Sequence, residues 1–178
     1  EDICAIAQKY KLIILSDEIY SELSFDENYK SISNFCPEKT IISTGLSKWC
    51  GAGGWRLGYF VVPENLKIIK KTLNVLASET FSAVSAPIQY AAIQAYEGNH
   101  KNYIKSSREI LKSVGNYVYE NLCSNKVSIK QPQGGFYLMP EFNNAKFRSS
   151  YEMCNNILKK TGVALLPVSD FGFDKERM

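Results

Sequence analysis

Apolar residues recur at helix and strand spacings in the first third of the chain, and they predict alternating helices and strands. At 2–10 the apolar side chains fall every three or four positions, which is the spacing of an amphipathic helix. A continuous apolar run follows at 12–15, and such a run is typical of a parallel strand that is covered on both faces. Further short strands are predicted at 39–44 and 57–62. The pattern therefore indicates an α/β fold.

After Pro63 the periodicity becomes mainly helical. Predicted helices cover 63–77, 86–96, 100–123 and 150–161, and predicted strands cover 127–130 and 163–167. Gly98 and Gly162 follow two of these helices and are expected to end them. The apolar stripe along the longest helix, which includes Ile104 and Ile110, is expected to lie in a core.

Candidate chemistry gathers in a glycine-rich stretch at 44–59 that follows the second predicted strand. Glycine lets a backbone approach a ligand closely, because it has no side chain and tolerates positive φ. Lys48 carries an amine that can form a Schiff base with an aldehyde. Arg56, eight positions further on, offers a planar fork of donors suited to phosphate, and Ser47 adds a hydroxyl. Together these groups indicate a phosphorylated aldehyde, for which pyridoxal phosphate is the obvious candidate.

From Ser47 to Tyr59 the sequence resembles the pyridoxal-phosphate aminotransferases of fold type I, class I/II. Their pattern is Ser-Lys, a short spacer and then Gly-Trp-Arg-Leu-Gly-Tyr. The resemblance is specific, because the spacing from Lys48 to Arg56 and the string around Arg56 agree together. One position departs from several members of the family. The third residue before the lysine, often a phosphate-binding serine, is Gly45 here.

The resemblance covers the C-terminal half of the family's much longer chains, so these 178 residues are interpreted as a fragment. It implies α/β architecture: part of a three-layer α/β/α large cofactor-binding domain at 1–98. A linking helix and an incomplete, smaller α+β domain are expected at 99–178. Residues 133–140 resemble the strand signature of that small domain, and the paired glycines there are expected to let the strand lie close to the substrate.

The resemblance also implies a role for each candidate site residue. Lys48 would hold pyridoxal phosphate as an internal aldimine and then move a proton at the substrate's α-carbon. Asp17 would pair with the cofactor's ring nitrogen, and Tyr20 would donate to the 3-hydroxyl oxygen. Ser47 and Arg56 would bind the phosphate. Since positions 17 and 20 face opposite sides of a straight strand, the backbone is expected to bend just after Asp17.

The implied activity is transfer of an amino group between an amino acid and a 2-oxo acid by a homodimer. A carbon–sulfur lyase or a related eliminating enzyme shares the motif and is an alternative, as is an inert interaction fragment. A cofactor-free Schiff-base aldolase is disfavoured by Asp17 and Arg56. The arginine that clamps the substrate carboxylate is expected beyond Met178. Arg177 follows a predicted polar turn at 174–176 and is not assigned that role. The fragment alone is expected to be inactive.

Composition and charge disfavour several other classes of function. The net charge of +3, with no basic block, gives no reason to expect nucleic acid. No apolar run approaches the roughly 18 residues of a membrane span. The five cysteines are odd in number and include no C-x-x-C pair, which favours free thiols in a reducing, cytoplasmic setting. His100 is the one histidine, so a histidine-rich metal site is impossible and no metal is predicted.

Overall fold

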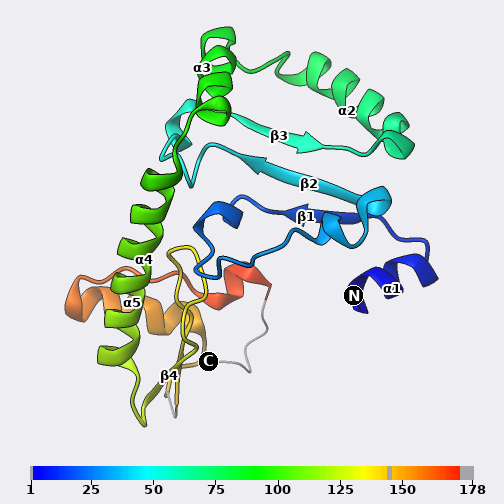
Figure 1. Cartoon of the computed structure of the whole chain (residues 1–178). Coiled ribbons are helices and arrows are strands. Elements are labelled where there is room, and N and C mark those ends of the chain that lie inside the picture. Colours follow the sequence, from blue (N-terminus) through cyan, green and yellow to red (C-terminus); the bar gives the residue numbers. More distant parts are fainter. Residues whose placement is uncertain (1, 144–145, 173–178) are drawn as a thin grey trace. The chain divides into compact units, whose positions relative to one another are not determined.

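The structure is a computed structural model that describes residues 2–143 and 146–172 (Figure 1). The chain divides into two compact units, residues 1–111 with 133–135 and residues 112–132 with 136–178. Helix α4 (Lys101–Leu122) contributes residues to both units. The predicted domain boundary at 98 stays a prediction about the whole protein. Arg177 and the predicted polar turn at 174–176 lie outside the described residues.

A three-stranded sheet is the centre of the first unit. Its strands lie in the order β1 (Ile14–Asp17), β2 (Thr40–Gly45) and β3 (Gly58–Val61) (Figure 1). β1 and β2 are parallel, whereas β2 and β3 are antiparallel. β-Branched and aromatic residues in these runs suit the pleated backbone. The three predicted strands are therefore confirmed, although β1 begins and ends two residues later than the apolar run suggested.

The helices of the first unit also follow the predicted periodicity. They are α1 (Asp2–Lys9), α2 (Lys67–Thr80), α3 (Ala86–Glu97) and the first part of α4. α2 starts later than predicted, because residues 64–66 form a separate 3-10 turn after Pro63. The backbone N–H of Gly98 donates to Gln94 O at 2.9 Å and closes the last turn of α3, as the glycine signal predicted.

The core of the first unit is small and lies around the glycine-rich stretch. Its buried members are Leu23, Leu46, Trp49, Ala52 and Ala92. Two half-buried residues of α4, Ile104 and Leu111, pack against this cluster. The prediction that the whole α4 stripe is core is wrong, since none of the described residues of α4 is buried and Ile110 is 63% exposed. The core is too small to cover more than part of that stripe.

Among the described residues, no strand pairs with the outer edge of β1 or β3, and the faces of the sheet are incompletely covered. The side chain of Leu15 in β1 is 65% exposed, and every residue of β3 is exposed. The prediction that the first strand is covered on both faces is therefore wrong for the residues described. A parallel strand needs helices on both faces of its sheet, and these residues do not supply that much cover.

The second unit pairs β4 (Val127–Ile129) with β5 (Pro140–Phe142) in an antiparallel ladder. It also contains α5 (Ser150–Thr161), whose predicted bounds are confirmed. The hydroxyl of Ser149 accepts a hydrogen bond from Glu152 N at 3.2 Å, which caps the first turn. Gly162 ends the helix with φ +77°, a backbone conformation that glycine adopts without strain.

Two strand predictions near the end of the chain are wrong. Residues 163–167 form no strand, and the side chain of Leu166 is 67% exposed. The stretch at 133–140 becomes a strand only at Pro140. Its two glycines instead join the first unit, where Gly134 forms a bridge with Ser24 and Gly135 N donates to Leu23 O at 3.0 Å. An apolar run or a family motif predicts a strand but does not identify its pairing partner.

Candidate active site

The carboxyl ends of β1 and β2 lie at the same edge of the sheet, where ligands gather in open α/β folds. β1 ends at Asp17, which lies opposite Ser43 of β2. The exposed carboxylate of Asp17 accepts a hydrogen bond from Ile19 N at 3.3 Å. The chain then turns into a 3-10 segment at Ser21–Leu23. The bend predicted just after Asp17 is thus confirmed.

The first turn after β1 and the loop after β2 bring Tyr20 and Lys48 together. The Nζ atom of Lys48 lies 5.5 Å from the centroid of the Tyr20 ring, a distance at which an ammonium and an aromatic face attract each other. Both side chains are half-buried. The Tyr20 ring also lies beside Gly135, where an added Cβ would lie 3.5 Å from Cδ1 of the ring. Two predicted site residues from separate segments, Tyr20 and Lys48, therefore lie close together.

The residues on either side of Lys48 fix its loop to the core. Leu46 is 1% exposed, and its carbonyl accepts a hydrogen bond from Ala52 N at 3.3 Å. Trp49 is buried, and its ring centroid lies 5.8 Å from that of Tyr96 in α3. Burial, and next a hydrogen bond with Tyr59, raise the pKa of Tyr96 well above its usual range. The residues on both sides of Lys48 are therefore held in the core.

Arg56 and Ser47 lie on the same loop as the lysine. Arg56 adopts a left-handed conformation with φ +57°, and its Nη1 donates to Gly53 O at 2.9 Å. A residue other than glycine in this region is uncommon, and such residues cluster at ligand-binding sites. Ser47 is half-buried, whereas Arg56 is exposed. The loop therefore places a hydroxyl and a guanidinium on either side of its glycines.

Gly45 has a structural reason to lack a side chain. A Cβ added at Gly45 would lie 2.6 Å from the carbonyl oxygen of Leu57 and 3.0 Å from the Cα atom of Gly58, both in the backbone leading into β3. A serine there would need the neighbouring strand to move. The departure from the family's pattern at this position therefore matches the close approach of β2 and β3.

Sequence reasoning missed the residues that hold the segment just after Tyr20. Arg108 of α4 donates from Nε to Glu22 O at 2.6 Å, and its guanidinium lies 3.7 Å from the Glu22 carboxylate. On the other side, Phe25 N donates to Gln133 O at 2.9 Å. The first contact joins residues 86 positions apart and the second joins residues 108 positions apart, so no local spacing could indicate them.

Comparison with known families identifies the family to which the chain belongs. The model of the family described as aminotransferase class I and II matches residues 1–178. The chain belongs to the class I and II aminotransferases. It is 32% identical to a probable N-acetyl-LL-diaminopimelate aminotransferase of Bacillus subtilis over 96% of the chain and 42% of that relative. It is 34% identical to an aspartate aminotransferase of Bacillus sp. strain YM-2 over 97% of the chain and 45% of that relative.

Solved structures of aminotransferases have the same fold. An alanine aminotransferase from Pyrococcus furiosus superposes with a TM-score of 0.87 at 32% identity, over 96% of this chain and 44% of that one. An aromatic aminotransferase from Pyrococcus horikoshii gives 0.87 at 27% identity, over 97% and 46%. The chain thus spans less than half the length of the aminotransferases it matches. These matches do not bear out the expectation that the chain is the C-terminal half of such a protein.

The residues of this aminotransferase chain fit pyridoxal phosphate chemically. Lys48 supplies an amine for the aldehyde, while Ser47 and Arg56 supply a hydroxyl and a guanidinium of the kind that binds phosphate. Asp17 and Tyr20 supply a carboxylate and a phenol for the polar atoms of the ring. Lys48 and Tyr20 lie within contact distance, and Asp17 ends the strand next to the one that leads into the loop.

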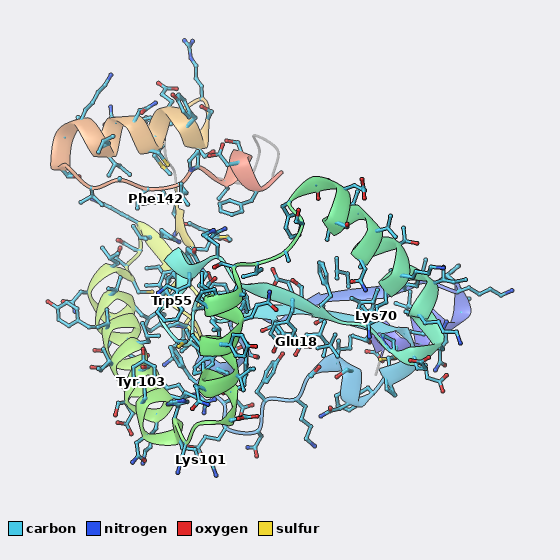
Figure 2. The ribbon with its side chains drawn as sticks, turned by 90° about the horizontal axis from the view of Figure 1, so that it is seen from above. Glu18, Trp55, Lys70, Lys101, Tyr103 and Phe142 are labelled. Atoms are coloured by element: carbon cyan, nitrogen blue, oxygen red, sulfur yellow. The ribbon has the colours of Figure 1, made fainter. Side chains whose placement is uncertain are left out.

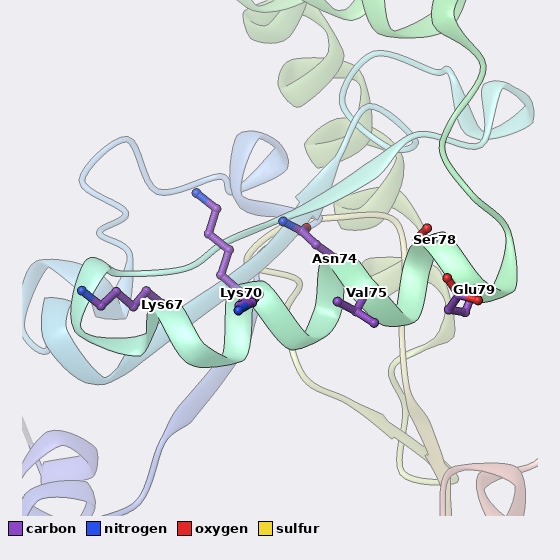
Figure 3. A pocket seen from close by; sticks show the side chains of 7 residues that line it. Lys67, Lys70, Asn74, Val75, Ser78 and Glu79 are labelled. Atoms are coloured by element: carbon purple, nitrogen blue, oxygen red, sulfur yellow. The ribbon is translucent and has the colours of Figure 1, made fainter.

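A hollow lies along one face of α2 (Figure 3). Its volume is about 430 Å³, and its walls are side chains of α2, among them Lys67, Lys70 and Glu79. None of the predicted site residues lines it. Among the described residues, no cluster of histidine, cysteine or carboxylate side chains is suited to a metal ion. None of the helices in the described part of the chain is long and apolar enough to cross a membrane.

Proposed function

We propose that the protein containing this chain is an aminotransferase that moves an amino group between an amino acid and a 2-oxo acid. Pyridoxal phosphate is the cofactor, and Lys48 is the residue that holds it. The observation that carries the proposal is the Lys48 amine 5.5 Å from the Tyr20 ring, in a chain that belongs to the aminotransferase family. Asp17 at the end of the neighbouring strand supports it.

Each site residue has a distinct task in this proposal. Pyridoxal phosphate, when bound, supplies an electron-withdrawing ring that stabilises negative charge on the substrate's α-carbon. The Nζ atom of Lys48 accepts the proton leaving that carbon and returns a proton later, as a general base and acid. The Asp17 carboxylate keeps the ring nitrogen protonated. The Tyr20 hydroxyl donates to the ring's 3-hydroxyl oxygen, and Ser47 and Arg56 orient the phosphate.

An eliminating enzyme, such as a carbon–sulfur lyase, is the alternative within the same chemistry. It would use Lys48 and Asp17 in the same way and differ in what leaves the substrate. Release of ammonia with no acceptor 2-oxo acid would identify elimination, whereas exchange of amino groups between two substrates would identify transfer. The matched relatives are named for aspartate, alanine and N-acetyl-diaminopimelate, so membership of the family leaves the amino acid open.

A cytoplasmic location and a homodimer complete the proposal. All five cysteines are free, which agrees with a reducing compartment. The exposed strands β1 and β3 give the first unit surfaces that another chain can cover. An inert interaction fragment would use the same surfaces without turnover. The transamination assay on the full-length protein therefore separates the two.

The test of the proposed function is the visible absorption spectrum of the full-length protein with added pyridoxal phosphate. We expect a visible band that is lost in Lys48→Ala, since the band depends on the bond between the lysine and the aldehyde. Lys39→Ala, a half-buried lysine before β2, is the matched control and should keep the band. An unchanged band in Lys48→Ala would remove Lys48 from the site.

A further inference from the structure

Among the described residues, Glu18 is the one buried carboxylate, with 8% of its surface exposed. It directly follows Asp17 at the end of β1, and Figure 2 labels it where the sheet meets the connector to β2. Burying a carboxylate costs free energy unless hydrogen bonds replace its lost water. A buried carboxylate beside the candidate site therefore needs hydrogen-bond donors, and its structural role has to be explained.

Glu18 obtains its partners from a serine network. Its Oε1 accepts from Ser16 Oγ at 3.0 Å and from Ser31 Oγ at 2.6 Å. Ser31 Oγ also lies 2.8 Å from Ser33 Oγ and accepts from Ser33 N at 3.1 Å. A hydroxyl has a single hydrogen, and that of Ser31 goes to Glu18, so the Ser33 hydroxyl must donate to Ser31. Every bond in the network then has a fixed direction.

The network joins the end of β1 to the middle of the connector. Ser31 caps the 3-10 turn Ile32–Asn34, thirteen positions after Glu18. Tyr29 of the same connector is close enough that burial, and next the charge of Glu18, raise the pKa of its phenol. Charge-assisted hydrogen bonds of this kind are roughly twice as strong as neutral ones. The hydrogen bond from Ser31 to Glu18 therefore holds the connector against the end of β1, next to Asp17.

The same residue also fixes the direction of its neighbours. Glu18 N donates to Ser43 O of β2 at 2.8 Å, and Glu18 O accepts from Ser21 N at 3.0 Å. Successive side chains of an extended chain point to opposite faces, so a buried Glu18 holds Asp17 on the exposed face. The turn that follows carries Tyr20 to the Lys48 amine.

We infer that Glu18 is a positioning residue, which acts through its hydrogen bonds to Ser16 and Ser31 and orients Asp17 and Tyr20 in the candidate site. It does not touch the cofactor or the substrate. The inference rests on the proposed function for its catalytic consequence. Its structural consequence, the restraint of residues 17–23 by the serine network, can be measured without any turnover.

The kinetic test uses the full-length protein with pyridoxal phosphate and the variants Glu18→Ala, Glu18→Gln and Ser31→Ala. We expect kcat to fall about tenfold to a hundredfold in Glu18→Ala, because small displacements of catalytic groups cost rates of this order. KM should change less than threefold, since binding contacts remain. Glu18→Gln keeps the acceptor oxygen and should recover part of the loss. Glu27→Gln, an exposed carboxylate of the same connector, is the control.

The structural test is amide hydrogen exchange of the same proteins. The N–H groups of Glu18, Ser21 and Leu23 are hydrogen-bonded, so they should exchange several-fold faster in Glu18→Gln and Ser31→Ala than in Glu27→Gln. Unchanged exchange, or a wild-type kcat in folded Glu18→Ala, would overturn the inference. If Glu18→Ala does not fold, the two milder variants decide it. Lack of transamination by the wild type would instead defeat the proposed function and leave the exchange result standing.

Discussion

Asp17 is the residue whose proposed role is chemical rather than structural. Its carboxylate is exposed at the end of β1, so its removal should disturb the fold little. We expect Asp17→Ala in the full-length protein to retain part of its affinity for pyridoxal phosphate. Its turnover should fall by orders of magnitude, because no carboxylate then keeps the ring nitrogen protonated. Steady-state transamination with parallel absorbance titration measures both. Asp26→Ala, an exposed aspartate of the connector, is the control.

Near-normal turnover in Asp17→Ala would contradict this role. The negative charge at the ring would then come from another group or be unnecessary. Glu18 is the adjacent candidate, but its carboxylate is buried and bonded to Ser16 and Ser31. The two acidic neighbours thus have different expected phenotypes, with Asp17 acting on the ring and Glu18 on the direction of Asp17.

Gly45 gives a stability prediction at the scale of one methyl group. In Gly45→Ala the new Cβ meets Leu57 O at 2.6 Å, so β3 must shift away from β2. Overpacking of this kind costs about 1–3 kcal/mol of unfolding free energy. Gly54→Ala is the matched control, because nothing lies within 4 Å of its added Cβ. Urea unfolding followed by circular dichroism compares the two. Equal midpoints would show that the strands can separate freely.

Candidate site residues could be proposed from sequence where a motif fixes their spacing. Lys48, Arg56 and Asp17 were assigned in this way, and the predicted bend after Asp17 is confirmed. Glu18 and Arg108 could not be assigned a role, because their partners lie 13 and 86 positions away. In the sequence, Glu18 beside Asp17 is typical of a solvated strand end, and only the fold brings Ser31 next to it.

Among the elements, α5 offers the clearest prediction. Its first turn depends on the Ser149 hydroxyl, which accepts from Glu152 N at 3.2 Å. Ser149→Ala should cost about 1 kcal/mol of unfolding free energy, the usual cost of losing such a cap. Ser149→Asp keeps an acceptor oxygen and adds negative charge at the helix N-terminus, so it should stay near the wild-type value. Thermal unfolding of the three proteins tests this ranking, and an unaffected Ser149→Ala would show that the cap is dispensable.

Helices were predicted well and strand partners poorly, for a physical reason. A helix such as α5 forms its backbone hydrogen bonds within the segment, so local spacing and end signals suffice to mark Ser150 to Thr161. A strand needs a partner that may be distant. The run at 163–167 has strand-like composition but forms no strand, and Gly134 pairs with Ser24, which lies far away in the sequence.

At the scale of the whole molecule, the sheet explains why parts of the chain remain uncovered. β2 is the central strand, and β1 and β3 each have a single neighbour in the sheet. Phe60 of β3 is 50% exposed and Leu15 of β1 is 65% exposed. The sequence predicted strands with buried faces because such continuous apolar runs are typical of a sheet that is covered on both faces. The matched aminotransferases are more than twice as long as this chain, which agrees with that interpretation.

The last prediction concerns these 178 residues on their own. They carry Lys48 and Asp17 but span only 42–45% of the matched relatives, so contacts from the rest of such a protein are missing. Each lost charge-assisted hydrogen bond costs about 1.5–3 kcal/mol, and several together weaken cofactor affinity by at least about three powers of ten. We therefore expect weak, slow binding at Lys48 and no measurable transamination.

The exposed edges β1 and β3 should at the same time recruit other copies, since unpaired strand edges are templates for association. We expect dimers or larger assemblies in size-exclusion chromatography with light scattering, alongside a coupled transamination assay. Phe60→Lys and Leu15→Lys should shift the distribution of oligomeric states towards monomer, because charge on an edge strand opposes pairing. A monodisperse and active monomer would show that these residues already contain a complete site and a sheet that needs no further cover.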